Sequence, residues 1–136
     1  MDGSRILPLT DLEAGVTEVI RLRRDGETRE AIVLKREDDS VAVWVNECQH
    51  IPDIPLDRGD GATMRGADLV CERHGAHYDT NSGRCTSGPC EGAVLPSVAV
   101  TVEDGQVVLT DEQYSLVGRG PIDRDSDLSS GGAVGF

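Results

Sequence analysis

The sequence contains Cys48-Gln49-His50 and, after residues 51–70, Cys71-Glu72-Arg73-His74. Each stretch places one thiol and one imidazole close enough along the chain to bind the same small ion or cluster from one tight loop. A single pair of this kind is weak evidence, but two pairs in one short chain are much more specific. The two stretches therefore predict a metal centre with four candidate ligands: Cys48, His50, Cys71 and His74.

Short β-rich runs lead into both stretches. Residues 41–45 (Val-Ala-Val-Trp-Val) end just before Cys48, and Leu69-Val70 runs directly into Cys71. Residues 52–61, between the pairs, contain too much proline and glycine for a regular element. Both ligand pairs are therefore predicted to lie on loops at the ends of strands.

The rest of the chain also indicates β-structure. Valine recurs in short bursts, glycine is abundant at 16 residues, and no long segment repeats apolar residues at helical spacing. Further expected strands are residues 5–9 (an edge strand, because of its proline), 16–24, 30–35, 76–80, 98–103 and 106–110. The 136 residues suffice for one domain with a buried core. The predicted fold class is all-β.

The clearest hairpin has a two-residue loop, Asp104-Gly105. This loop sets Val102 opposite Val107 and Val100 opposite Leu109. One face of the hairpin then carries only apolar residues and is predicted to lie in the core: Val98, Val100, Val102, Val107 and Leu109.

The apolar pattern weakens beyond Thr110. We therefore expect a domain over residues 1–110, with its metal-binding loops within 46–92, and a C-terminal extension over 111–136 that is partly docked or flexible. From Gly118 onward the sequence is rich in Gly, Ser and Asp, which favours a disordered tail. The residues able to dock part of the extension on a sheet are Tyr114, Leu116 and Val117.

Two cysteines and two histidines suit two different metal groups. A tetrahedral zinc ion accepts this donor set directly. A [2Fe–2S] cluster accepts it when two thiolates bind one iron and two imidazoles bind the other, which makes the cluster easier to reduce. Each loop must then give one ligand to each iron, so that Cys48 and Cys71 share one iron while His50 and His74 share the other. A zinc site does not require so long a β-framework, which favours the cluster.

The two stretches resemble the cluster-binding loops of the Rieske family, the second of them over residues 71–79. Gly83 and Gly88-Pro89 resemble the turn and the proline-containing loop that cover the cluster there, and residues 98–109 resemble the closing hairpin. The resemblance spans about residues 5–110. It implies a sandwich of small antiparallel sheets with a cluster-binding subdomain, and one Rieske-type [2Fe–2S] cluster per chain.

Departures from the quinol-oxidising members of that family imply an intermediate reduction potential. Those members carry an extra cysteine in each loop, joined as a disulfide. Here Arg73 and a residue at or near Asp53 hold those places, so no disulfide between the loops is expected. They also carry two hydroxyl groups that donate hydrogen bonds to sulfur; Tyr78 matches one, and Ala76 replaces the other.

Cys85 and Cys90 flank the expected covering loop, and three interpretations of them remain open. They are small buried side chains without a function, or a disulfide across the loop, or cluster ligands together with Cys48 and Cys71. The last interpretation leaves both Cys/His pairs to coincidence. His77, which points away from Ala76 and Tyr78 on a strand, is expected to be structural or exposed.

The resemblance implies a small soluble electron carrier rather than an enzyme. Such a protein accepts an electron from a reductase and passes it to an oxygenase or another redox partner. The alternatives are an accessory subunit of a redox complex, of the nitrite reductase small-subunit type, and a structural zinc-binding domain. His77 is the one histidine outside the ligand pairs, so no mononuclear iron triad is expected.

The net charge of −12 predicts a partner with a basic surface and argues against nucleic acid and anionic membranes. Lys35 is the single lysine among the 13 basic residues, and aspartate dominates the acids. This bias suggests either an ordinary acidic protein or a halophilic source, whose salt screens the self-repulsion. The first residues show no signal pattern, and no 18 apolar residues run together, so we expect a cytoplasmic protein without membrane insertion.

Overall fold

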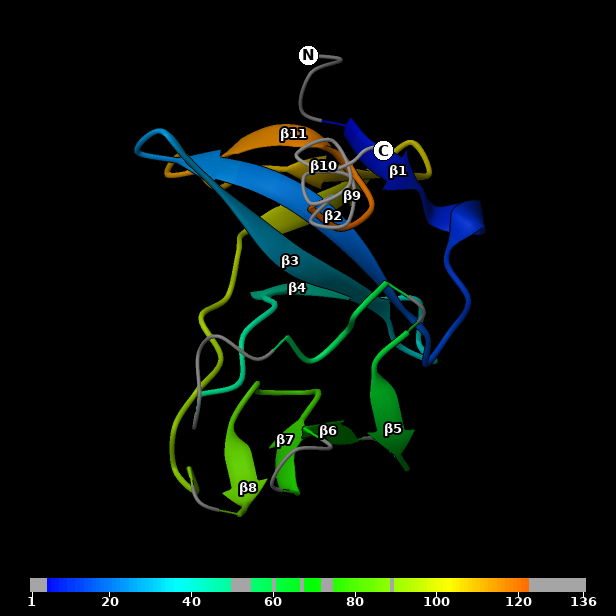
Figure 1. The fold of residues 1–136 in the computed structure, drawn as a ribbon. Coiled ribbons are helices and arrows are strands. Elements are labelled where there is room, and N and C mark those ends of the chain that lie inside the picture. Colours follow the sequence, from blue (N-terminus) through cyan, green and yellow to red (C-terminus); the bar gives the residue numbers. More distant parts are fainter. Residues whose placement is uncertain are drawn as a thin grey trace, which may run out of the picture.

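The computed structural model describes residues 5–49, 55–59, 61–66, 68–71, 75–88 and 90–122. Within them the chain forms three small antiparallel sheets and no α-helix, which confirms the predicted fold class (Figure 1). The described part of the chain contains no helix that is long and apolar enough to cross a membrane. The elements are β1 (Arg5–Pro8), the 3-10 turn η2 (Leu9–Asp11), β2 (Thr17–Arg24), β3 (Glu27–Lys35), β4 (Val41–Val45), β5 (Thr63–Arg65), β6 (Asp68–Cys71), β7 (Ala76–Asp79), β8 (Cys85–Ser87), β9 (Val100–Glu103), β10 (Gln106–Leu109) and β11 (Ser115–Arg119).

The central sheet has the strand order β11-β2-β3-β4. Strands β2 and β3 form its longest hairpin, and Asp25 and Gly26 close it with positive φ angles of 53° and 82°. A two-residue turn of this kind suits the right-handed twist of paired strands. Strand β3 begins at Glu27, earlier than the predicted residue 30, because the residues that follow so tight a turn are already paired with β2.

The second sheet has the order β1-β10-β9 and confirms the predicted hairpin register. Val107 pairs with Val102 and Leu109 with Val100. The predicted core face is wrong at one position: Val102, which lies near the Asp104-Gly105 turn, is 40% exposed. Strand β1 lies at the edge of this sheet, as its proline predicts.

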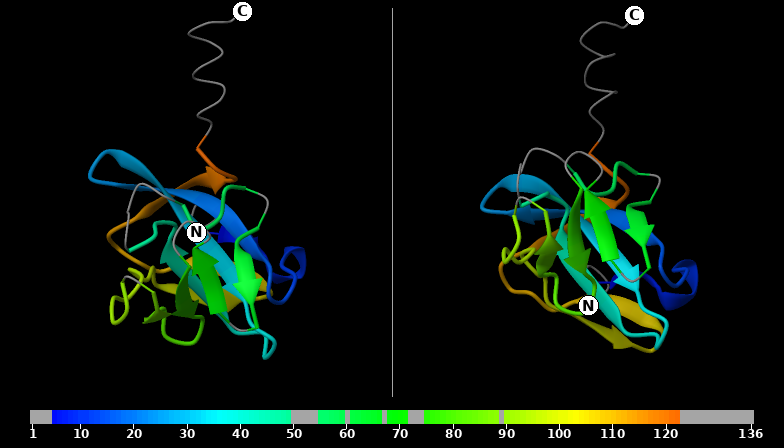
Figure 2. Two further views of the ribbon diagram at one scale, coloured as in Figure 1. Left: turned by 60° about the horizontal axis from the view of Figure 1, so that its bottom comes forward. Right: turned by 90° about the horizontal axis from the view of Figure 1, so that it is seen from below.

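The third sheet has the order β5-β6-β7-β8. Cys48 and Cys71, the candidate ligand cysteines, both belong to the core cluster between this sheet and the central sheet. The third sheet forms a separate layer on the opposite side of the central sheet from β9 and β10 (Figures 1 and 2). Strands β5 and β8 were not predicted from the sequence, because each is only three residues long and shows no alternating apolar pattern. Cys71 is the last residue of β6.

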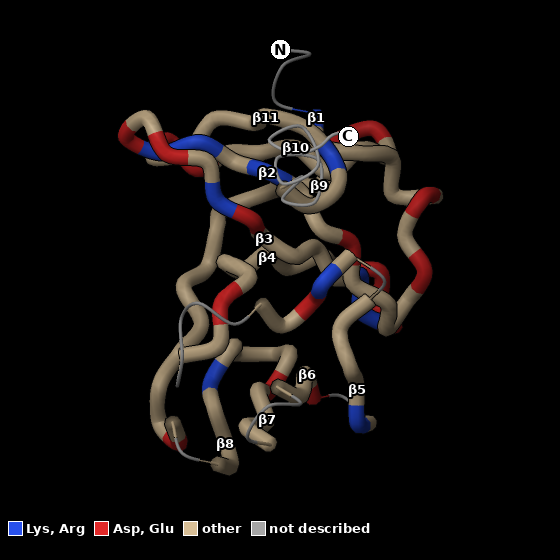
Figure 3. The backbone as a smooth tube through the Cα atoms, viewed as in Figure 1, with Lys and Arg blue, Asp and Glu red and all other residues tan. Residues whose placement is uncertain are grey.

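Part of the aspartate excess has a conformational role in the turns. Asp25, Asp39 and Asp104 all have positive φ angles, of 53°, 70° and 51°. Among residues with a side chain, aspartate and asparagine tolerate this left-handed conformation best. Many acidic positions lie at the ends of hairpins and in loops along the described backbone, and others lie within strands (Figure 3).

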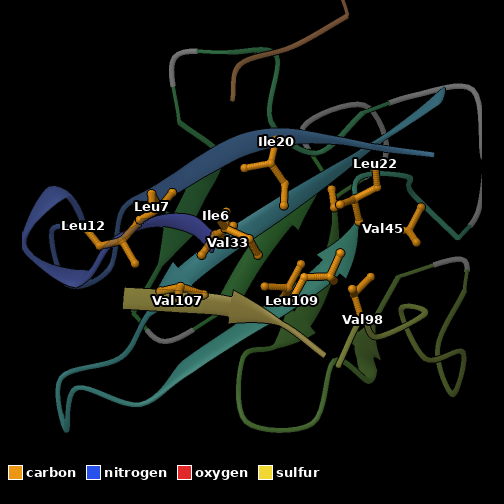
Figure 4. Close-up of a cluster of buried hydrophobic side chains, with 12 residues drawn as sticks. Ile6, Leu7, Leu12, Ile20, Leu22, Val33, Val45, Val98, Val107 and Leu109 are labelled. Carbon is orange, nitrogen blue, oxygen red and sulfur yellow. The ribbon is translucent and has the colours of Figure 1, made fainter. Parts of the chain in front are cut away.

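The core consists of two clusters on the two faces of the central sheet. Side chains of β3 alternate between them: Val33 faces the first cluster, whereas Ile32 and Leu34 face the second. The first cluster packs against the β1-β10-β9 sheet (Figure 4). The second cluster packs against the β5–β8 sheet and contains Trp44, which is 3% exposed.

Residues 115–122 of the C-terminal extension dock on the central sheet. Strand β11 pairs with β2, and the Gly120 amide donates to the Val19 carbonyl at 2.7 Å. Tyr114 and Leu116 pack against the first core cluster, whereas Val117 is 42% exposed. Residues 123–136 lie outside the described residues.

Candidate metal centre

Cys48 and Cys71 approach the second core cluster from two different elements. Cys48 follows β4 and is fully buried, and Cys71 ends β6 with 2% of its surface exposed. After Cys71 the chain reverses, and the Gly75 amide donates to the Cys71 carbonyl at 2.8 Å. Gly75 has a φ of 76°, a conformation that favours glycine. Both candidate sulfur ligands are thus sheltered from water at the ends of strands.

The other members of the predicted site lie outside the described residues. These are the candidate imidazole ligands His50 and His74 and the covering-loop residue Pro89. Arg73 and Asp53, the residues at or near the places where quinol-oxidising family members carry the disulfide cysteines, lie outside them as well. The roles of these residues stay predictions.

Tyr78 connects the first ligand loop to the loop that carries Cys90. Its side chain, from β7, is fully buried. The Tyr78 Oη accepts a hydrogen bond from the Gln49 amide at 2.8 Å and lies 3.6 Å from Cys48 Sγ and 3.1 Å from Cys90 Sγ. Burial, and next the hydrogen bond with Cys90, raise the pKa of Tyr78 well above its usual range. The hydroxyl therefore stays protonated and can donate a hydrogen bond to a sulfur.

Ala76 lies where the covering loop touches the β5–β8 sheet. It pairs with Cys71 across β6 and β7 and is fully buried. A Cβ built on Gly88 would lie 2.8 Å from the Ala76 Cα and 3.3 Å from its Cβ. The close approach of Gly88 explains why this loop position has no side chain, a feature visible in the sequence only through the resemblance to the family.

Cys85 and Cys90 lie beside Tyr78 as a pair of thiols. Their Sγ atoms are 3.1 Å apart, and Cys85 Sγ donates to the Ser87 carbonyl at 3.2 Å. Cys85 is fully buried and Cys90 is half-buried; neither is in a disulfide. Burial is the main cause that raises the pKa of the Cys85 thiol to about 11.

His77 points out of the site, as expected for a strand neighbour of two buried residues. Its Nδ1 lies 3.6 Å from Asp68 Oδ2 on the paired strand, and its side chain is 28% exposed. Ala76 and Tyr78, on either side of it, are fully buried.

Sequence reasoning missed Asn46, which anchors the first ligand loop. Its side chain is buried and makes four hydrogen bonds. Nδ2 donates to Glu30 Oε1 at 3.1 Å and to the Asp57 carbonyl at 2.7 Å, while Oδ1 accepts from the amides of Leu56 and Asp57. An asparagine just after a strand is a weak signal, because residues of this type commonly form turns there.

The described part of the site fits an iron–sulfur cluster. Such a cluster needs thiolates from two loops, shelter from water, and hydrogen-bond donors near sulfur. Cys48 and Cys71 provide buried sulfur from two loops in one apolar cluster, and Tyr78 provides a hydroxyl at Cys48.

Comparisons with known proteins agree with this arrangement. Residues 6–101 match the family model of the Rieske [2Fe-2S] domain. The chain is similar to the ferredoxin of carbazole 1,9a-dioxygenase from Nocardioides aromaticivorans IC177: 26% identity, a TM-score of 0.62, and coverage of 79% of this chain and 96% of the ferredoxin. No curated protein matches the sequence.

Two more distant structures show the same fold. A Sphingomonas yanoikuyae B1 ferredoxin is 24% identical, with a TM-score of 0.58 and coverage of 77% of this chain and 94% of that one. A protein provisionally named as the small subunit of an NADPH nitrite reductase is 18% identical, with a TM-score of 0.55 and coverage of 83% and 96%.

Proposed function

The chain belongs to the Rieske [2Fe-2S] domain family, and from this membership we propose that it carries single electrons from a reductase to an oxygenase or another redox protein. It performs no further reaction of its own in this proposal. The observation that carries the proposal is the buried sulfur site at the ends of β4 and β6, with the Tyr78 hydroxyl 3.6 Å from Cys48 Sγ.

Four residues hold the cluster in this proposal. Cys48 and Cys71 bind one iron through their thiolates, and His50 and His74 bind the other through imidazole nitrogens, with one cluster per chain. When bound, the cluster supplies a centre that takes up and releases one electron. Burial of Cys48 and Cys71 supports this assignment, because it keeps water away from the sulfur that bears the charge.

Residues around the site adjust how readily the electron is accepted. In this proposal the Tyr78 hydroxyl donates a hydrogen bond to Cys48 Sγ, and this contact stabilises the extra negative charge of the reduced centre. The Gln49 amide, which donates to Tyr78 Oη, orients the hydroxyl. Ala76 has no donor to offer at the second position, so one donor acts where quinol-oxidising relatives have two.

The partner in this proposal has a basic docking surface. The net charge of −12 attracts such a surface and speeds encounter at low salt. The similar ferredoxin from Nocardioides aromaticivorans IC177 belongs to a carbazole 1,9a-dioxygenase, which supports an oxygenase as the acceptor.

Metal and sulfide analysis of the purified protein tests the proposal. We expect two iron and two acid-labile sulfide per chain, with an electron paramagnetic resonance signal of histidine-ligated type after reduction by dithionite. Replacement of His50 or His74 by Ala should remove the signal, whereas His77→Ala should leave it in place, because His77 points out of the site. One zinc per chain without sulfide would overturn the proposal.

An accessory subunit of a redox complex is the second candidate function. The similarity to the provisionally named nitrite reductase small subunit favours it, although the fold alone is shared at that identity. The two candidates use the same electron transfer and differ in whether the chain stays bound. Tagged protein that reduces an added oxygenase while migrating alone on gel filtration supports the carrier; co-purification with a larger subunit supports the accessory role.

A further inference from the structure

Cys85 and Cys90 are two thiols that the electron-transfer proposal does not use. They come from β8 and from the loop that follows it, and they are separated by residues 86–89, of which Thr86, Ser87 and Gly88 are exposed. Their Sγ atoms lie 3.1 Å apart, so a bond of about 2.05 Å requires the sulfurs to approach by only about 1 Å.

Backbone hydrogen bonds hold both cysteines in place. The Cys85 amide donates to the Ala93 carbonyl at 2.7 Å, and the Gly92 amide donates back to the Cys85 carbonyl at 2.8 Å. The Ala93 amide donates to the Cys90 carbonyl at 2.9 Å. Because this frame fixes both ends of the loop, the sulfurs stay close without help from the metal site.

We propose that Cys85 and Cys90 are a redox-modification site, at which a small-molecule disulfide oxidises the pair to a reversible intraloop disulfide. The half-buried Cys90 meets the oxidant first, and its thiolate attacks the disulfide, forming a mixed disulfide and releasing one thiolate of the reagent. The Cys85 thiolate then attacks Cys90 Sγ and releases the second. Two cysteine protons are lost, two electrons pass to the reagent, and a dithiol reductant reverses the reaction.

Tyr78 transmits the state of the pair to Cys48. Its single proton has two sulfur neighbours, Cys90 Sγ at 3.1 Å and Cys48 Sγ at 3.6 Å. Formation of the disulfide converts Cys90 Sγ from a thiol into a disulfide sulfur, and in this proposal the Tyr78 hydroxyl then donates its hydrogen bond to Cys48 Sγ. This second step rests on the proposed function: a stronger hydrogen bond to a ligand sulfur raises the reduction potential of the centre.

Peptide mapping of the holoprotein tests the disulfide. The protein is incubated with oxidised glutathione, alkylated with iodoacetamide in denaturant without reduction, and digested with trypsin. Cleavage after Arg84 and Arg119 places Cys85 and Cys90 alone in peptide 85–119, because no Lys or Arg lies between those residues; Cys48 and Cys71 fall in peptides 37–58 and 66–73.

We expect peptide 85–119 to lose both alkylation sites after oxidised glutathione and to regain both after dithiothreitol. Two alkyl groups without reduction, or glutathione retained on Cys90, would overturn the proposal. In Cys85→Ser the second step is blocked, so that variant should retain glutathione on Cys90. The thiol count does not depend on the bound metal, so it is readable even if iron analysis refutes the proposed function.

Voltammetry of the oxidised and reduced pair tests the link through Tyr78. The wild type should show a higher reduction potential after oxidised glutathione, and Cys85→Ser should show no rise. A potential that does not change on formation of the disulfide would refute the link, and an unchanged iron content would show that the centre survives the treatment.

Discussion

At the scale of single residues, Tyr78 is the residue that we propose both orients and tunes the centre. One hydroxyl accepts the Gln49 amide and lies within reach of two sulfurs. Because the hydroxyl has one hydrogen, it can donate a full hydrogen bond to only one of these two sulfurs at a time. Cys90 is therefore able to influence the Cys48 sulfur through the Tyr78 hydroxyl.

Tyr78→Phe should lower the reduction potential. Loss of a hydrogen bond worth about 1 kcal/mol more in the reduced state corresponds to roughly 40 mV for one electron. Ala76→Ser should shift the potential upward, because it restores the second donor. Protein-film voltammetry of both variants measures the shifts, and absence of any shift in both would refute the roles given to these residues.

Asn46→Ala should destabilise the fold by about 3 kcal/mol, because it removes four buried hydrogen bonds, among them those that the Leu56 and Asp57 amides donate to Asn46 Oδ1. Urea unfolding followed by circular dichroism measures this cost. Asn81→Ala, at an exposed turn, is the control and should change stability by less than about 0.5 kcal/mol. Equal effects of the two substitutions would show that the Asn46 network is not important for stability.

The buried Cys85 thiol predicts a loss of stability at alkaline pH. Its folded-state pKa of about 11 lies above the ordinary value of 9.0, so the folded protein retains a proton that the unfolded chain has lost. The stability that the protonated Cys85 thiol contributes to the fold is complete below pH 9 and is lost as pH rises toward 11. With reductant present, the stability difference between wild type and Cys85→Ala should therefore shift against the wild type over this window. A difference independent of pH would contradict the raised pKa.

At the scale of elements, the loop that follows β8 packs closely on strand β7 where Gly88 meets Ala76. Gly88 has a φ of 105°, and an added Cβ would meet the Ala76 backbone. Gly83 likewise has no room for a side chain, because an added Cβ would lie 2.7 Å from Trp44 Nε1. Two glycines thus let the β5–β8 sheet pack closely on itself and on the central sheet.

Gly88→Ala should destabilise the protein more than Gly92→Ala. Both glycines have positive φ angles, 105° and 96°, so both substitutions carry a similar backbone strain of about 1–3 kcal/mol. A Cβ on Gly92 meets nothing within 4 Å, whereas a Cβ on Gly88 collides with Ala76. Thermal unfolding and iron retention measure the difference, and equal losses would indicate that the Ala76 contact carries no energy.

At the scale of the whole molecule, the negative charge opposes compaction. The ion pairs of the described residues include Arg24–Asp25 and Arg29–Glu27, whose side chains are largely exposed and stabilise the fold little. The net charge of −12 therefore acts mainly through general repulsion, which salt screens over about 3 Å at 1 M.

Stability should rise as KCl increases from low concentration to about 1 M, where the Debye length falls to about 3 Å. Urea unfolding at each KCl concentration measures the rise, with sucrose at matched osmolality as the control for solvent exclusion. A fold whose stability does not depend on KCl would contradict both the repulsion argument and the hypothesis of a halophilic source.

Much of the fold could be predicted because it depends on neighbours in sequence. The Asp104-Gly105 turn sets the register of β9 and β10 through local geometry, and the proline of β1 places that strand at an edge. Strand β11 was not predicted as a strand, because its partner β2 lies far away in the sequence and Gly118 and the polar residues near it weaken its pattern.

The sequence by itself determined the chemistry of this protein: the types and spacing of Cys48, His50, Cys71 and His74, the all-β class and the hairpin turns. These properties follow from short-range spacing, which needs no knowledge of packing. Only the tertiary structure decided which groups meet around Tyr78 and Ala76: the Gln49 amide and two sulfurs at Tyr78, and Gly88 at Ala76. Such contacts depend on how separate strands pack around the second core cluster, and no local pattern in the sequence encodes the distances between them.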